Sequence, residues 1–297
     1  MTWRVWFLLL SLSVLWGGSF FFAKVALGGL GPLTVVFGRV ALAALALNLI
    51  NPLRRDAPWR TFFAMGALNN VIPFTLIFWG QTHIASGLAS ILNATTPLFT
   101  VVVAHLLTDD EKVTGWKVVA LLSGIAGVAV LIGPTAFMQP NDSLWGELAC
   151  LAAALSYAFA GIYGRRFRAM GIAPLDAATG QVTASSLLIL PIMLSVEQLW
   201  NGPLPTPTIW AATFGALAAL ALLSTALAYV LYFRILAAAG ATNLLLVTFL
   251  IPVTSILLGA VFLQERLESR HFAGMALICL GLLVIDGRLG RLLHPAK

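Results

Sequence analysis

Two stretches of this chain decide its fold: FWGQTHIASGLASILNATTP, residues 78–97, and FRILAAAGATNLLLVTFLIP, residues 233–252. Laid over each other, they align Pro97 with Pro252, and each proline interrupts a long apolar segment. Proline removes a backbone donor within a helix and recurs rarely at matched places by chance. The alignment therefore indicates an internal repeat.

The repeat continues past the two prolines. An acidic residue, Glu111 or Glu265, follows each proline at nearly the same distance, with one residue of offset. A glycine-rich final segment then closes each half, in which Gly127 and Gly133 match Gly281 and Gly287.

The composition places the chain in a membrane. Of its 297 residues, 60% are hydrophobic and 9% are charged, whereas soluble domains carry roughly 25% charged residues. Apolar stretches of about 18 or more residues are long enough to cross a bilayer as helices. Ten such spans are predicted, at residues 4–25, 32–50, 60–80, 84–106, 115–133, 144–164, 175–199, 209–234, 240–263 and 271–286.

Five spans per repeat is an odd number, so the second copy must enter the membrane from the opposite side. We therefore predict an all-α integral membrane protein of ten transmembrane helices, built from two inverted five-helix repeats, residues 1–139 and 140–297, around a central cavity. Inverted repeats are a recurrent plan of secondary transporters, whose substrate site lies near the midplane.

Lys and Arg are enriched in cytoplasmic loops, which predicts the orientation. The side opposite the termini carries only Lys24, Arg266 and Arg270. The side shared by both termini carries thirteen basic residues: Arg4, Arg54, Arg55, Arg60, Lys112, Lys117, Arg165, Arg166, Arg168, Arg234, Arg288, Arg291 and Lys297. Both termini are thus predicted to be cytoplasmic, in a bacterial inner membrane. The sequence Arg165-Arg166-Phe167-Arg168 is read as a connection between spans.

The motif Trp16-Gly17-Gly18-Ser19-Phe20, the two proline spans, the acidic residue of each last hairpin and the closing Gly-x5-Gly pattern resemble the EamA family of the drug/metabolite transporter superfamily. Within it, the chain is most similar to bacterial aromatic amino acid exporters. The resemblance covers essentially the whole chain. It implies a cavity lined by spans one, three, four, six, eight and nine, and substrates such as amino acids.

Arg39 is the main candidate for substrate binding, because a carboxylate entering the membrane needs a cation. Its alternative role is a structural anchor for helix-end carbonyls. Lys24 lies near a span end, where it can reach the headgroups. The polar candidates are Asn70, Asn93 and Thr96, which could instead join helices. The aromatic candidates, which could instead face lipid, are Trp16, Phe74, Phe78, Trp79, Tyr157, Tyr229 and Tyr232.

The carboxylates all fall in loops or at span ends, which favours facilitated alternating access over coupling through a buried acid. We predict export of amino acids, aromatic and other neutral ones, and of related metabolites. Efflux of drugs or nucleoside-like metabolites, with or without proton coupling, is the alternative; an intramembrane enzyme or scaffold is a third reading. No catalytic residue, metal, cofactor or nucleic acid partner is expected, and the protein is expected to be a monomer or weak homodimer in the lipid bilayer.

Overall fold

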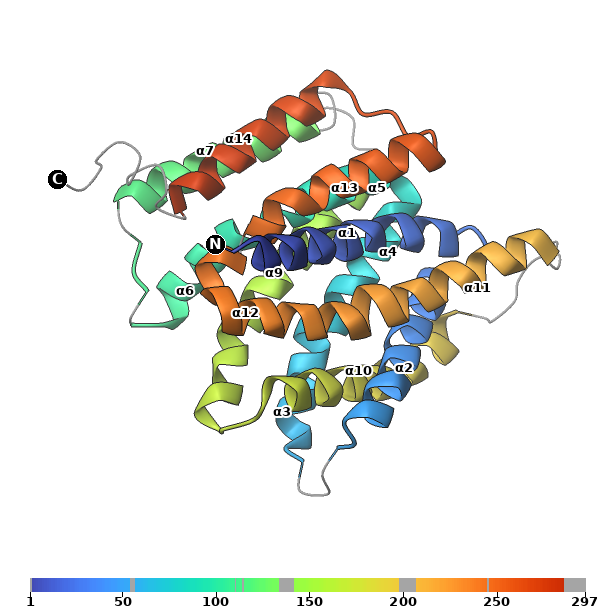
Figure 1. Ribbon diagram of the computed structural model, residues 1–297. Coiled ribbons are helices and arrows are strands. Elements are labelled where there is room, and N and C mark those ends of the chain that lie inside the picture. The colour runs from blue at the N-terminus through green and yellow to red at the C-terminus, as the bar shows by residue number, and fades with distance from the viewer. Residues whose placement is uncertain are drawn as a thin grey trace.

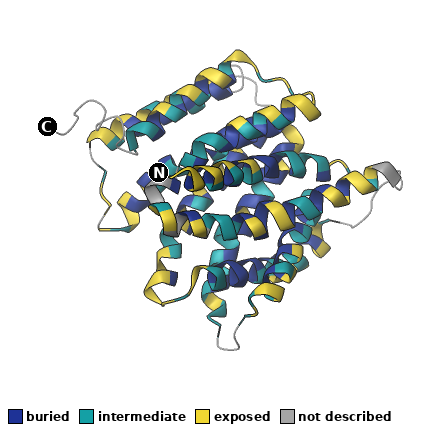
Figure 2. Cartoon of the chain, viewed as in Figure 1, coloured by how far each residue is buried: buried dark blue, intermediate teal, exposed yellow. Residues whose placement is uncertain are grey.

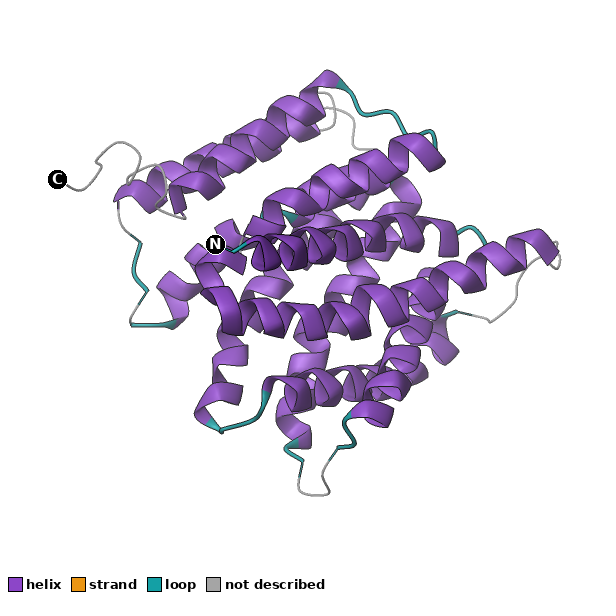
Figure 3. Ribbon diagram, viewed as in Figure 1, coloured by secondary structure: helices purple, strands orange, loops and turns teal. Residues whose placement is uncertain are grey.

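The computed structural model describes residues 2–53, 57–109, 111–113, 115–133, 142–197, 207–244 and 246–285, and these residues form helices without any strand (Figure 3). In chain order the elements are α1 (Trp3–Ala26), α2 (Pro32–Ile50), α3 (Trp59–Gly66), η1 (Ala67–Val71), α4 (Ile72–His83), α5 (Ser86–Asn93), α6 (Thr96–Leu107), α7 (Gly115–Ile132), α9 (Asp142–Ala169), α10 (Pro174–Val196), α11 (Pro207–Ala221), η2 (Leu222–Leu227), α12 (Ala228–Leu244), α13 (Leu246–Phe262) and α14 (Ser269–Ile285). Figure 1 shows their arrangement.

Eight helical segments within the described residues are long and apolar enough to cross a membrane. Five of them are single helices: α1, α2, α7, α9 and α10. The other three combine shorter elements: Trp59–His83, Ser86–Leu107 and Ile209–Tyr232. The remaining helices α13 and α14 are apolar but have only 17 residues each.

The span predicted at 84–106 is interrupted where α5 gives way to α6. The Thr95 hydroxyl donates to the Leu92 carbonyl at 2.6 Å, and the Thr96 hydroxyl donates to the Asn93 carbonyl at 2.7 Å. Pro97, in the first turn of α6, needs no partner for a backbone N–H. The backbone of α12 is also interrupted, at Gly240 with φ 76°, a conformation that L side chains rarely adopt.

The prediction that Arg165 to Arg168 form a connection is wrong, because α9 continues to Ala169. Phe167 is buried and packs on Phe62, with the ring centroids 5.8 Å apart, which holds the last turns of the helix against α3. Basic side chains are also favourable near a helix C-terminus, where the carbonyl dipoles point. The arginines therefore belong to the last turns of α9 and not to the connection that follows it.

Helices far apart in the sequence pack in pairs, as Figure 1 shows for α7 with α14 and α1 with α13. The α7–α14 pair meets at two glycines. A Cβ atom on Gly127 would lie 2.8 Å from the Gly274 carbonyl oxygen, and one on Gly274 would lie 2.6 Å from that of Gly127. Small residues allow such close approach, which is how helices associate in a membrane.

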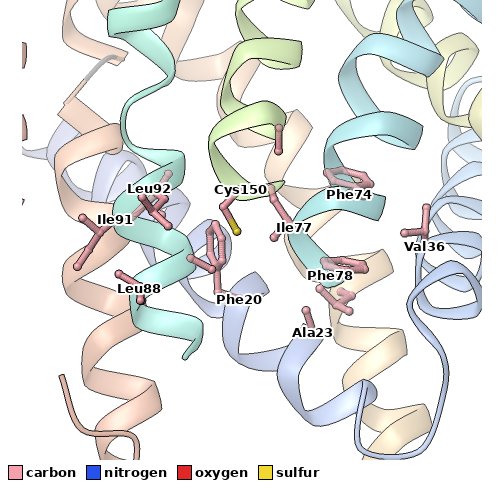
Figure 4. Close-up of a cluster of buried hydrophobic side chains, with 14 of the residues drawn as sticks. Phe20, Ala23, Val36, Phe74, Ile77, Phe78, Leu88, Ile91, Leu92 and Cys150 are labelled. Carbon is pink, nitrogen blue, oxygen red and sulfur yellow. The ribbon is translucent and has the colours of Figure 1, made fainter. Parts of the chain in front are cut away.

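Large apolar side chains face outward as well as inward. Figure 2 shows exposed positions along the outer faces of the helices, and Leu45, Leu49, Leu122 and Leu257 are each at least 60% exposed. The main buried cluster joins α1, α2, α4, α5 and α9 (Figure 4). An apolar exterior of this extent suits contact with lipid acyl chains.

Candidate functional site

Two π-helical turns, η1 and η2, lie within the helical segments that contain α4 and α12. The π-helix is rare and is often found at functional sites, because its wider turn shifts side chains and frees carbonyl groups. In η2 the Thr225 hydroxyl donates to the Leu220 carbonyl at 2.9 Å, and beside η1 the Ser156 hydroxyl donates to the Leu68 carbonyl at 2.7 Å. Pro73 lies in the first turn of α4, directly after η1.

Arg39 projects from α2 into the protein and is 6% exposed. Its Nε donates a hydrogen bond to Thr225 Oγ1 at 2.9 Å, so η2 positions the guanidinium. The guanidinium carbon lies 3.8 Å from the ring centroid of Phe74 and 5.8 Å from that of Phe78. A cation over an aromatic face at this distance is stabilised by the ring quadrupole.

The two phenylalanine rings belong to successive turns of α4. They are stacked, with centroids 6.1 Å apart and planes 9° from parallel. In Figure 4 Phe74 and Phe78 lie one above the other on the side of α4 that faces Val36 of α2. They form an apolar wall beside the Arg39 guanidinium.

The Arg39 charge has no carboxylate partner among the residues that the structure describes. The ionisable side chains that interact with it electrostatically are the phenols of Tyr157 on α9 and Tyr229 on α12. A buried, unpaired cation is unfavourable by several kcal/mol or more. The arrangement can therefore accept an anion from outside the chain.

A hydrogen-bonded network borders the same region. Asn70 of η1 is fully buried; its Nδ2 donates to Ser185 Oγ at 2.9 Å, and its Oδ1 accepts from the Tyr229 hydroxyl at 3.4 Å. Asn69 Nδ2 donates to Gln181 Oε1 at 2.9 Å. These contacts tie η1 to α10 and α12. Thr225, Gln181 and Ser185 were not among the predicted site residues, and nothing in their sequence context marks them.

The aromatic candidates extend the cluster toward α1. Trp16 and Tyr232 have ring centroids 5.7 Å apart, inclined at 42°. Tyr232 follows Tyr229 by one turn of α12. The structure thus brings together Arg39, Asn70, Phe74, Phe78, Tyr157 and Tyr229, with Trp16 and Tyr232 adjoining.

Three predicted residues lie apart from this cluster. Trp79 is 40% exposed and packs on His83 of its own helix, with ring centroids 4.7 Å apart. Asn93 and Thr96 sit at the interruption between α5 and α6, where Thr96 bonds to the Asn93 carbonyl. The Asn93 Oδ1 atom is buried without a hydrogen-bond partner in the described part of the chain.

Two charged residues, Glu265 and Lys24, bind backbone groups where α4 ends and α5 begins. The Glu265 carboxylate accepts hydrogen bonds at the start of α5 from the Ser86 amide at 2.9 Å and the Ser86 hydroxyl at 2.7 Å. The Lys24 ammonium binds the carbonyl groups of Gln81 and Ile84 at the end of α4. A carboxylate or ammonium that binds helix ends in this way fixes neighbouring helices to each other.

Glu147 is the one acidic residue of the described helix interiors that is almost fully buried. It lies in the second turn of α9 and is 2% exposed. Ser143 Oγ donates to its Oε1 at 3.4 Å, and its Oε2 has no partner in the part of the chain described. Its position near a helix end agrees with the sequence, but its burial was not predicted.

The membrane-length helices, with a buried arginine beside the Phe74 ring, are features of a multi-pass membrane protein. The chain belongs to the EamA-like transporter family, which matches residues 3–133 and 144–286. It is a multi-pass membrane protein.

Two curated relatives cover nearly the whole chain. The uncharacterized transporter YoaV of Bacillus subtilis (strain 168) is 25% identical over 92% of this chain and 94% of its own. The "Probable terminal-alkyne amino-acid exporter" of Streptantibioticus cattleyicolor is 27% identical over 97% of this chain and 95% of its own. The fold is also similar to a crystal structure of a protein that is 20% identical, with a TM-score of 0.63 over 95% of this chain and 96% of that one.

Proposed function

We propose that this protein is a secondary transporter that exports amino acids, aromatic and other neutral ones, and related metabolites, by facilitated alternating access. The observation that carries the proposal is the buried Arg39 guanidinium, which lacks a carboxylate partner in the described residues and is flanked by the Phe74 ring. A substrate carboxylate would neutralise the cation, and an apolar side chain would lie against the rings. The named amino-acid exporter among the relatives supports this substrate class.

The proposal includes ten membrane crossings. Helices α13 and α14 each have 17 residues, which is about 26 Å at 1.5 Å per residue. That length approaches the roughly 30 Å of a hydrocarbon core.

Packing supports two inverted repeats at 1–139 and 140–297, whose boundary falls outside the described residues. Helix α1 of the first repeat packs on α11, α12 and α13 of the second repeat. In the same way, α9 of the second repeat packs on α4, α5 and α6 of the first. In such an arrangement the α2–α10 and α7–α14 pairs, which pack on each other, would each join matching helices of the two repeats. The π-turns η1 and η2 occupy corresponding places in the third and eighth proposed crossings. Rocking of one repeat against the other would expose a central site alternately.

Both termini are proposed to be cytoplasmic, in a bacterial inner membrane, because loops with more Lys and Arg stay on the cytoplasmic side. Of the residues counted for this, Arg54, Arg55, Arg288, Arg291 and Lys297 lie outside the described residues. The expected monomer or weak homodimer also stays a prediction.

The test is uptake and counterflow in liposomes that contain only the purified protein, with labelled neutral amino acids and with or without an imposed pH gradient. Saturable movement of an aromatic amino acid, lost in Arg39→Gln and kept in the matched surface variant Arg60→Gln, is expected. No movement of any amino acid would contradict the substrate class. Acceleration by a pH gradient would contradict facilitated transport.

Efflux of drugs or nucleoside-like metabolites is the second candidate. The Trp16–Tyr232 pair favours it, because two inclined rings 5.7 Å apart can pack on a planar ring system without any need for Arg39. Transport of such a compound that survives Arg39→Gln but fails in Trp16→Ala would favour this alternative.

A further inference from the structure

The charged and ionisable groups around Arg39 determine the net charge of the site. Tyr157 and Tyr229 are its ionisable partners, and both are neutral phenols at ordinary pH. No described carboxylate is an electrostatic partner of Arg39. Five of them bind elsewhere: Glu265 at α5, Glu197 at the start of α2, Glu111 on Arg165, Glu268 on Arg270 and Asp176 on Asn51. The cluster therefore carries one positive charge.

Three neutral hydrogen-bond acceptors near Arg39 already receive donors. Asn70 Oδ1 accepts from the Tyr229 hydroxyl, Gln181 Oε1 accepts from Asn69, and Thr225 Oγ1 accepts from Arg39 itself. The negative face of the Phe74 ring is occupied by the guanidinium at 3.8 Å. An ammonium group that bound one of these three acceptors would have to displace its donor or share the acceptor with it.

From this charge balance we infer that the site prefers apolar organic carboxylates that lack an ammonium group, such as aryl carboxylates and N-acylated amino acids, over zwitterionic amino acids. A monoanion neutralises Arg39 and brings no second charge. A zwitterion brings an ammonium that loses its water and meets like charge in a region of low dielectric, where such interactions are strong. The inference rests on the proposed function, because it assumes that substrate binds at Arg39.

The experiment uses three compounds that share a phenyl ring on a short chain. Phenylalanine is a zwitterion at about pH 7, 3-phenylpropionate is an anion, and phenethylamine is a cation. Binding is measured on the full-length purified protein by the shift of its thermal unfolding midpoint. Transport is measured separately, as competition with labelled phenylalanine in liposome counterflow.

We expect 3-phenylpropionate to bind at least about tenfold more tightly than phenylalanine, and phenethylamine not to bind. Arg39→Gln should abolish the preference for the anion. Arg39→Lys keeps the charge and should retain the preference, which separates a charge effect from misfolding. Arg60→Gln removes an exposed arginine of α3 and should leave all three affinities unchanged.

The outcomes separate this inference from the proposed function. Phenylalanine that is transported and binds as tightly as 3-phenylpropionate would overturn the inference and leave amino acid export standing. Binding of the anion that depends on Arg39, without movement of any compound in liposomes, would support the inference and contradict transport. If none of the three binds, both are overturned.

Discussion

Arg39 Nε lies 2.9 Å from Thr225 Oγ1, so a single hydrogen bond joins the second helix of the chain to the π-turn η2, 186 residues further along. The Thr225 hydroxyl in turn donates to the Leu220 carbonyl. Thr225 of the π-turn therefore presents an acceptor to the guanidinium and donates to a carbonyl in the last turn of α11.

Thr225→Val should raise the KM for substrate about five- to tenfold with a smaller change in kcat, because a hydrogen bond to a charged group contributes about 1.5–3 kcal/mol and part of it is recovered by water. Counterflow kinetics in liposomes measure both constants. Thr225→Ser keeps the hydroxyl and should behave as wild type. Equal KM values for Thr225→Val and wild type would mean that Thr225 does not position Arg39.

Asn70→Ala should destabilise the protein by about 1–3 kcal/mol, since it leaves Ser185 Oγ without its amide donor and removes an acceptor of the Tyr229 hydroxyl in a buried region. Thermal unfolding in detergent, followed by circular dichroism, measures the loss. Thr82→Ala is the control: its exposed hydroxyl bonds only to the Trp79 carbonyl one turn away, and its removal should change little. Equal stability of the two variants would show that the Asn70 network does not hold η1 in place.

Glu147→Gln should leave stability unchanged or increase it, because an amide of the same size has no charge to desolvate at this 2% exposed position. The same unfolding assay applies. Asp109→Asn is the control, since Asp109 forms an exposed pair with Lys112 at 3.8 Å and should shift stability by no more than about 0.5 kcal/mol. A marked loss of stability in Glu147→Gln alone would show that the ionised carboxylate has a partner essential to the fold.

Gly127→Ala should destabilise the α7–α14 pair, because the added Cβ would lie 2.8 Å from the Gly274 carbonyl oxygen and the helices must separate. Overpacking of this kind costs about 1–3 kcal/mol. Gly115→Ala, at the start of α7 with nothing within 4 Å of the new Cβ, should be neutral or mildly stabilising. If both variants unfold at the same temperature, the close glycine contact does not set the stability of this pair.

The sequence predicted a structural feature correctly where a single residue type determines that feature. Apolar length predicted the long helices, and Pro97 marked the interruption between α5 and α6. Arg39 stood out because an ionisable residue inside a span is costly and must have a reason. The family resemblance was confirmed over nearly the whole chain.

Facing directions were harder to predict, because in helices that are apolar on every side no periodic pattern tells the protein face from the lipid face. Phe78 is buried and the neighbouring Trp79 is 40% exposed, although both were predicted to bind substrate. Successive residues point about 100° apart around a helix of 3.6 residues per turn. Which of the two faces inward depends on where α4 meets α9.

By itself, the sequence determined that this protein is helical and membrane-embedded, because only segments that satisfy their own backbone hydrogen bonds can lie in lipid. It also indicated which residue types form the candidate site: one arginine and several aromatic residues. Tertiary structure alone decided that Thr225 holds Arg39, that Phe74 lies over the guanidinium, and that Glu147 is buried. These contacts join residues remote in the chain, and their geometry depends on the crossing of helices and on two π-turns that no local sequence preference specifies.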